Sequence, residues 1–186
     1  MTTITSAAHP DSLTLPWSPI VADATLYYRF DATEHARRQQ TAAAPLTVAA
    51  LETLMSLPLD MGVSLASLTA SERARVHQLP AGAATIADGH VTRRAVRPLV
   101  VDLAAVSGPP RKALEQASRF APFCARLAVL ARPARHMCDY LNEAAFWGVG
   151  VAVAGELVLE PSPWRPQRHT VAGWRFVEQV YERATG

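Results

Sequence analysis

The pattern of apolar and polar positions is clearest in the second half of the chain, where two short apolar runs flank an amphipathic segment. The first run, LVVDLAAV, begins at Leu99, and the second, ARLAVLA, begins at Ala125. Both runs are short and bounded, which is typical of buried strands in a parallel sheet. Proline cannot donate within a central ladder, so we expect the first strand to begin at or just after Pro98.

A Gly-Pro-Pro break at residues 108–110 precedes the amphipathic segment. Its apolar positions share one helical stripe and are Ala113, Leu114, Ala117 and Phe120. Its charged positions fall away from that stripe, as in a helix that packs on a sheet. We therefore predict a strand, a crossover helix and a parallel strand, with the right-handed connection that is usual for such a unit.

Three more elements are expected before the end of the chain. The segment RHMCDYLNEAAFWG predicts a helix that ends at Gly148, and VGVAVAGELVLEP predicts a hairpin that turns near Ala154 and Gly155. A last helix, GWRFVEQVYERAT, is expected to bury Trp174, Val177, Val180 and Tyr181. The fold class is therefore α/β, of mixed α+β character, with a mixed sheet flanked by helices.

The middle of the chain predicts a different arrangement. A helix face formed by Val48, Leu51, Leu54 and Met55 ends before Pro58. Ser64 can cap a short helix through Leu68, and Thr69 or Ser71 can cap a second helix that runs to Leu79. Asp88 and Gly89 form a strong hairpin signal. Three helices and a hairpin predict a winged helix over residues 46–97.

The first 45 residues are expected to form an N-terminal arm. They carry scattered prolines, one short strand candidate, ATLYYRF, and one short helix candidate after Asp31. The aromatic residues of the arm are expected to pack on the body of the protein. The predicted organisation is an arm over 1–45, the winged-helix-like segment over 46–97, and a core with its C-terminal helix over 98–186.

Composition limits the class of protein. The chain has 186 residues, 49% of them hydrophobic, which is enough for a real core. Its apolar stretches end well before the roughly 18 residues of a membrane span, and its N-terminus lacks a basic start and an apolar run. We expect a cytoplasmic protein with no membrane partner. Cys124 and Cys138 are too few for a disulfide scaffold or a zinc site, so two reduced thiols are expected.

The net charge of +2 does not by itself require a nucleic-acid partner, so the distribution of charge matters more. The candidate DNA-binding residues are the cations of the second short helix and of the hairpin: Arg73, Arg75, His77, His90, Arg93 and Arg94. In this interpretation the helix enters a major groove and the hairpin contacts phosphates. In the alternative, the helices support the following sheet and the arginines are a solvated face. Lys112 is the only lysine, a bias typical of a GC-rich genome, which weakens any argument from arginine alone.

The second half also resembles a known superfamily. A strand ending in an acidic residue, Asp102, a helix with ALEQASRFAPF, a strand ARLAVLA, a helix and the segment GVGVAVAGELVLEP are similar to the carboxy-terminal core of the PD-(D/E)XK, or restriction-endonuclease-like, superfamily. The similarity covers roughly residues 88–160, with a weaker extension toward residue 47 that is similar to a preceding winged helix in bacterial members. Gln116 and Phe120 stand where one branch has a Gln-x-x-x-Tyr pair.

The resemblance implies a nuclease site that has degenerated. Members hold Mg²⁺ with Asp and Glu oxygens and use a lysine to activate water, but here the motif reads Asp102-Leu103-Ala104 and lacks the lysine. Asp102, Lys112 and Gln116 are vestigial candidates, with no catalytic residue and no metal ligand predicted. Without that chemistry, Asp102 caps a helix or accepts a bond from a backbone amide.

Three hypotheses on function follow. The first is a non-catalytic, DNA-associated pseudo-nuclease that serves as a DNA-binding or assembly platform, either as a homodimer or with a protein partner, and without a cofactor. The second is an active Mg²⁺-dependent nuclease that uses Asp102, a migrated Lys112 and an unrecognised acid such as Glu115. The third is a protein-interaction subunit of a larger complex that does not bind DNA.

Overall fold

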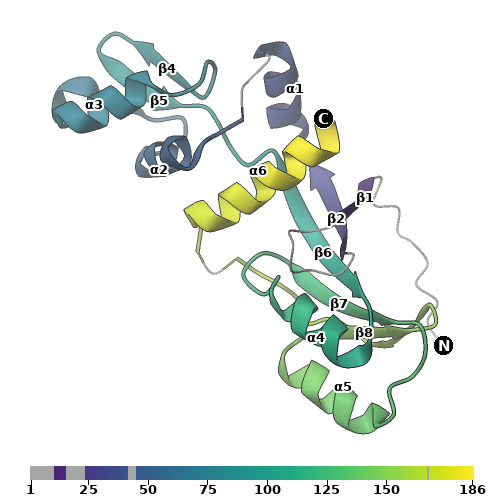
Figure 1. Ribbon diagram of the computed structural model, residues 1–186. Helices are drawn as coiled ribbons and strands as arrows, with labels where there is room; N and C mark the ends of the chain where they lie inside the picture. The colour runs from purple at the N-terminus through teal and green to yellow at the C-terminus, as the bar shows by residue number, and fades with distance from the viewer. Residues whose placement is uncertain (1–10, 16–23, 42–44, 167) are drawn as a thin grey trace. The chain divides into compact units, whose positions relative to one another are not determined.

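The computed structural model describes residues 11–15, 24–41, 45–166 and 168–186, which form a mixed α/β fold (Figure 1). The chain divides into two compact units. We call the first the sheet unit; it combines the chain up to Arg29 with Val101–Gln167. We call the second the helix–hairpin unit; it combines Phe30–Val100 with Arg168–Gly186.

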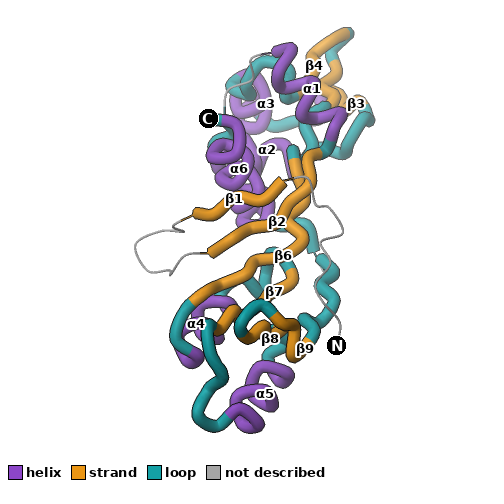
Figure 2. Tube along the Cα trace, turned by 90° about the vertical axis from the view of Figure 1, so that its right-hand side faces the viewer, coloured by secondary structure: helices purple, strands orange, loops and turns teal. Residues whose placement is uncertain are grey.

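The sheet unit is built on a mixed sheet with the strand order β1-β2-β6-β7-β8-β9 (Figure 2). The strands are β1 Asp11–Leu15, β2 Ala24–Phe30, β6 Leu99–Ser107, β7 Ala125–Leu130, β8 Gly150–Val153 and β9 Glu156–Leu159. Strands β6, β7 and β8 are parallel, whereas the β1–β2 and β8–β9 pairs are antiparallel. The predicted parallel pair is confirmed: β6 and β7 run in the same direction, with Leu103 opposite Ala125 and Ser107 opposite Val129.

The crossover between β6 and β7 is the predicted amphipathic helix, α4 Pro110–Ser118. Pro110 occupies the first turn, where its missing N–H costs no hydrogen bond. The apolar stripe predicted from sequence is buried, and Phe120, just beyond the helix, is only 2% exposed. The crossover helix therefore packs on the sheet through the apolar side chains that its helical periodicity predicts to be buried.

The two remaining connections of the sheet unit also follow local signals. Helix α5 Met137–Phe146 is followed by Gly148, whose φ of +66° suits glycine at a helix C-terminus. The β8–β9 hairpin turns through Ala154 and Gly155, which both have positive φ, as a two-residue type I′ turn requires. At Gly150 an added Cβ would lie 2.6 Å from the backbone nitrogen of Pro161, so this close approach requires glycine.

The helix–hairpin unit contains a three-stranded antiparallel sheet with the order β3-β5-β4. Its elements in chain order are α1 Ala32–Thr41, α2 Val48–Ser56, β3 Gly62–Ser64, the 3₁₀ turn η1 Leu65–Ser67, α3 Ala70–His77, β4 Ala84–Ala87, β5 His90–Arg93 and α6 Val171–Thr185. Their positions confirm the helices and the hairpin expected over residues 46–97, apart from the first short helix, which is a single 3₁₀ turn without a side-chain cap from Ser64.

Helix starts in this unit are set by threonines. Thr47 accepts a hydrogen bond from the Ala50 backbone N–H at the start of α2. Thr69 forms a capping box with Glu72 at the start of α3, which selects Thr69 over Ser71 as the cap. The hairpin turns at Asp88 and Gly89, with φ values of +50° and +70°.

The C-terminal helix packs within the helix–hairpin unit. Trp174 of α6 is 2% exposed and belongs to the same apolar cluster as Leu51 and Leu54 of α2, and the two helices lie side by side (Figure 1). This helix therefore belongs to the unit that contains Phe30–Val100, whereas the organisation predicted from sequence places it with residues 98–186. A second cluster, of Leu57, Val76 and Val91, joins α2, α3 and the hairpin.

Buried charges join α1 to α6. Arg38 donates to both oxygens of Glu178 at 2.7 Å and through Nε to Glu34 at 2.8 Å. Arg37 donates to both oxygens of Glu34 and to the Gly82 carbonyl. Each buried carboxylate therefore has a guanidinium partner, which burial of a charge requires.

Within the part of the chain that the structure describes, no helix is long and apolar enough to cross a membrane.

Candidate functional site

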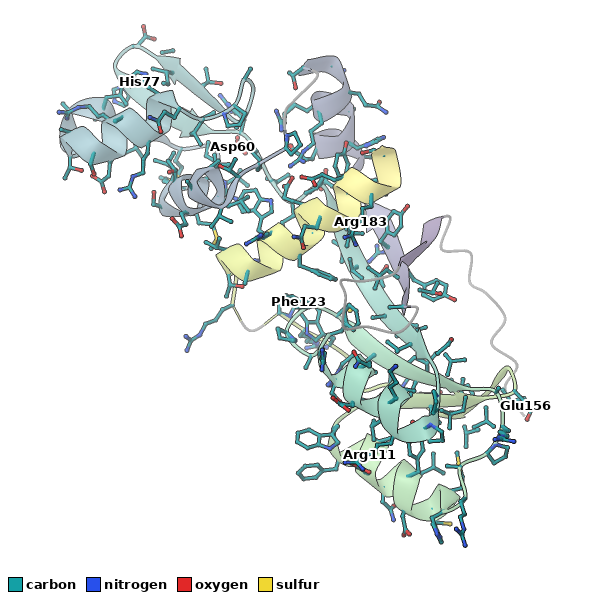
Figure 3. All side chains as sticks on the ribbon, in the orientation of Figure 1. Asp60, His77, Arg111, Phe123, Glu156 and Arg183 are labelled. Atoms are coloured by element: carbon teal, nitrogen blue, oxygen red, sulfur yellow. The ribbon has the colours of Figure 1, made fainter. Side chains whose placement is uncertain are left out.

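The exposed face of α3 is the first part of the candidate nucleic-acid interface. Val76 is the buried position of the helix. At about 100° per residue, Arg75 and His77 lie on the two borders of the opposite face, and both are exposed. Figure 3 labels His77 in the part of the helix–hairpin unit that contains α3 and the β4–β5 hairpin.

The middle of this face is formed by residues that are not among the DNA-binding candidates predicted from sequence. Ser71, Ala74 and Gln78 are exposed and lie roughly opposite Val76. Small side chains let a helix backbone approach a groove closely, and Gln78 carries the amide that can read a base edge. The same helical periodicity, applied around Val76, would have found them.

Arg73, in contrast, stabilises the fold through hydrogen bonds to the backbone. Its Nη1 donates to the backbone carbonyls of Leu65 and Leu68 at the two ends of η1. These bonds tie the 3₁₀ turn to α3. The guanidinium is half-buried in this role, so Arg73 does not belong to the exposed face predicted from sequence.

The hairpin contributes two exposed side chains. His90 Nδ1 lies 2.8 Å from the Asp88 carbonyl oxygen across the turn. Arg94, just after β5, forms an exposed ion pair with Asp60 at 3.1 Å. Exposed ion pairs contribute little to stability, so Arg94 can exchange Asp60 for a phosphate at small cost.

Arg93, the last residue of β5, lies on the opposite face of the strand from His90. Its Nε donates to the Ala95 carbonyl, its Nη1 donates to the Leu54 carbonyl at 3.1 Å, and its guanidinium stacks 4.7 Å from the centre of the Trp174 ring. Burial, followed by the charge of Arg97, lowers its pKa. The structure gives Arg93 an internal role, in place of the phosphate contact predicted from sequence. Side chains alternate between the two faces of a strand, so the sequence places Arg93 on the same face as Val91, which is buried.

Asp102 lies in the middle of β6 rather than at its end, and it is held by an arginine of the same unit. Arg29 donates through Nε and Nη2 to the two carboxylate oxygens, both at 2.8 Å. This bidentate pair raises the pKa of Arg29, mainly through the hydrogen bond to Asp102. The pairing was not among the partners expected from sequence, a helix terminus or a backbone amide, and it occupies both carboxylate oxygens.

The other vestigial candidates lie on α4, the crossover helix that follows β6. Lys112 and Glu115 are exposed on α4. Gln116 is buried, and its Oε1 has no hydrogen-bond partner among the described residues. Within the described ranges, no group of three or more His, Cys, Asp or Glu residues could hold a metal ion.

The cysteines have different surroundings but both are free thiols. Cys124 is fully buried, and burial raises its pKa to about 12. The thiol therefore stays protonated at neutral pH, which makes it a poor nucleophile and a poor metal ligand. Cys138 is exposed on α5.

Comparison with known proteins gave no relative: the chain matches no protein-family model, no curated protein and no solved structure. The resemblance to restriction-endonuclease-like proteins therefore remains a prediction. The arguments on function that follow rest on the residues and geometry of this chain.

Incubation of the purified protein with plasmid, linear and single-stranded DNA in Mg²⁺ or Mn²⁺ is expected to leave all three substrates intact. The reason is that Asp102 is paired with Arg29 and that no second acid or lysine lies with it on β6. Gel electrophoresis after prolonged incubation measures the outcome. Cleavage that Asp102→Ala abolishes, and that Glu156→Ala on the exposed β8–β9 hairpin leaves unchanged, would contradict this expectation.

Proposed function

We propose that this protein is a non-catalytic, DNA-associated protein that binds duplex DNA through α3 and the β4–β5 hairpin of the helix–hairpin unit. The observation that carries the proposal is the order of elements: a helix, a strand, a short 3₁₀ turn, a second helix and a hairpin, in one sheet of order β3-β5-β4. This is the order of a winged helix, in which the second full helix enters the major groove as in other helix-turn-helix proteins.

The exposed face of α3 supports the proposal. Its centre is formed by Ser71, Ala74 and Gln78, so the helix is narrow where it would enter a groove about 12 Å wide. Arg75 and His77 on its borders would contact the phosphates on either side. The ion-paired Arg94 and the turn residue His90 would contact the backbone next to the hairpin.

The sheet unit has a supporting role in this proposal. In this unit Asp102 is paired with Arg29 and the buried Cys124 is protonated, so neither side chain is available as a metal ligand or as a nucleophile. We propose that the sheet unit is a restriction-endonuclease-like fold that serves as an assembly platform, through a second copy of the chain or a protein partner.

Duplex affinity is expected to fall with salt and to depend on the exposed arginines of the helix–hairpin unit. Each phosphate contact contributes about 0.9 to the slope of log affinity against log salt. The double variant Arg75→Ala/Arg94→Ala should therefore flatten the slope by about 1.8 and weaken binding to every duplex alike. Fluorescence anisotropy with a labelled duplex at several salt concentrations measures both quantities.

The matched control removes the same charge from the sheet unit. Arg132 and Arg135 are exposed in the segment before α5, and their double alanine variant is expected to keep the parent slope. Arg93 is not used, because it holds the Leu54 carbonyl and its loss would disturb the fold. Equal slopes for the two double variants, or no binding by the parent at physiological salt, would overturn the proposal.

A second candidate function is a protein-interaction subunit that does not bind DNA. It is favoured by one observation on the sheet unit: Phe146 and Trp147 at the end of α5 are 81% and 52% exposed and form an edge-to-face pair. Exposed aromatic side chains of this size often mark interaction sites. This function becomes the first candidate if the salt-dependence experiment fails.

A further inference from the structure

A pocket of about 600 Å³ in the helix–hairpin unit is not used by the proposed DNA contacts. Its polar lining includes Arg93, Arg97 and His169, and its apolar lining includes Leu59, Val96 and Trp174. The volume lies within the range of pockets that bind small molecules. The lining residues come from the start of α1, from α2 and the segment after it, from the end of β5 and the segment after it, and from the start of α6. All of these segments belong to the helix–hairpin unit.

Arg97 is the least compensated charge in this pocket. It is half-buried, and burial lowers its pKa. Within the described part of the chain its guanidinium donates no hydrogen bond and forms no ion pair, in contrast to the buried Arg38. Its Nη2 lies beside the first turn of α6, since a Cβ added at Gly173 would be 3.4 Å from it. The positive end of a helix offers no compensation to a cation.

The neighbouring charges leave the pocket positive. Arg93 lies close enough for Arg97 to lower its pKa after the effect of burial. The acid that acts on Arg93, Asp60, is already paired with Arg94. Asp31, which also lines the pocket, caps α1 by accepting a bond from the Glu34 backbone N–H. Two guanidinium groups therefore share a partly desolvated space with one carboxylate.

The apolar side of the pocket extends to its mouth. Leu59 and Val100 are 45% and 50% exposed, and both line the pocket together with Met55. Apolar side chains around a few convergent polar groups are typical of sites for small organic ligands. An oxyanion would give Arg97 a hydrogen-bond partner and would lie beside the charge of Arg93, and an attached apolar body would cover these side chains.

We propose that this pocket binds a small organic anion, with a carboxylate or phosphate headgroup on Arg97 and Arg93 and an apolar body against Leu59, Val96 and Trp174. Arg97 is the residue that selects the charge of the ligand, because its donors have no partner among the described residues and planar guanidinium groups bind both headgroups in bidentate fashion. The inference does not rest on the proposed DNA binding.

Isothermal titration of the full chain with three naphthalene probes tests the proposal. The probes are naphthalene-2-carboxylate, 2-naphthyl phosphate and the neutral naphthalene-2-methanol. At least one of the two anions is expected to bind about tenfold or more tightly than the neutral probe, as a charged hydrogen bond predicts. The stronger anion identifies the headgroup. Equal binding of the neutral probe, or no binding of either anion, would overturn the proposal.

Arg97→Gln locates the site, and Arg175→Gln is its control. Arg97→Gln is expected to weaken the preferred anion about tenfold or more, while Arg97→Lys keeps part of the affinity. Arg175 is exposed on α6 and does not line the pocket, so its variant should bind as the parent does. Arg97 donates no bond to the described fold, so circular dichroism of Arg97→Gln should match the parent. A folded Arg97→Gln that keeps the parent affinity would overturn the assignment, as would displacement of the anion by duplex DNA.

Discussion

Glu178→Ala is expected to destabilise the protein by about 3–5 kcal/mol, because it leaves a buried guanidinium without its main partner. Arg38 is 6% exposed and donates to both oxygens of Glu178, and Trp174 Nε1 donates to the same carboxylate at 2.9 Å. Burial alone would lower the pKa of Arg38, but the bonds to Glu178 and Glu34 outweigh it and raise that pKa above its ordinary value. The variant removes the larger part of this compensation.

Urea unfolding followed by circular dichroism measures the loss, with Glu115→Ala as the control. Glu115 forms an exposed pair with Arg119 at 3.4 Å, and such pairs contribute between nothing and about 1 kcal/mol. A Glu178→Ala loss no larger than that of Glu115→Ala would show that the buried pairs do not hold α1 to α6.

Phe120→Ala is expected to cost about 3–5 kcal/mol, the usual loss for a buried phenylalanine. The ring is 2% exposed directly after α4, and the backbone around it is held by the bonds Phe120 N to Ala117 O and Phe123 N to Phe120 O. Removal of the ring would leave a cavity beside the end of α4 that the surrounding structure can only partly fill.

Phe146→Ala is the matched control for this variant. Phe146 is the same residue type in the same unit but is 81% exposed, so its removal should change the free energy of unfolding by about 0.5 kcal/mol or less. If Phe120→Ala cost less than about 1 kcal/mol, the packing of the crossover on the sheet would have to be reconsidered.

Elements with a local signal could be predicted from sequence. Thr69 with Glu72, the Asp88-Gly89 turn and Pro110 each set a boundary through bonds or backbone angles within a few residues. Short-range chemistry of this kind does not depend on the rest of the fold, so the α-helices and both hairpins could be predicted, whereas the short helix expected after Ser64 is a single 3₁₀ turn. The two bounded apolar runs predicted the parallel β6–β7 pair.

The buried ion pairs could not be predicted, because they depend on distant parts of the chain. Helix α1 has the sequence ATEHARRQQT, which resembles a solvated helix, yet Glu34 and Arg38 are buried in it. Their burial depends on Glu178, which lies 140 residues from Arg38. No pattern within α1 reports that partner. The same holds for Asp102, whose partner Arg29 is 73 residues away.

The candidate site was predictable in part. Arg75, His77, His90 and Arg94 are exposed as expected, whereas Arg73 and Arg93 hold backbone carbonyls. A count of arginines cannot separate these two groups, because it ignores which face each side chain shares. The burial of Val76 and Val91 makes that separation.

The most direct test of the proposed function is to map duplex DNA on the full chain by nuclear magnetic resonance of the backbone amides. We expect that addition of DNA shifts the signals of Ala70–Gln78 and of Ala87–Val91, while those of Met137–Phe146 on α5 stay in place. Shifts confined to the sheet unit, or none at a DNA concentration that saturates helix-turn-helix proteins, would contradict it.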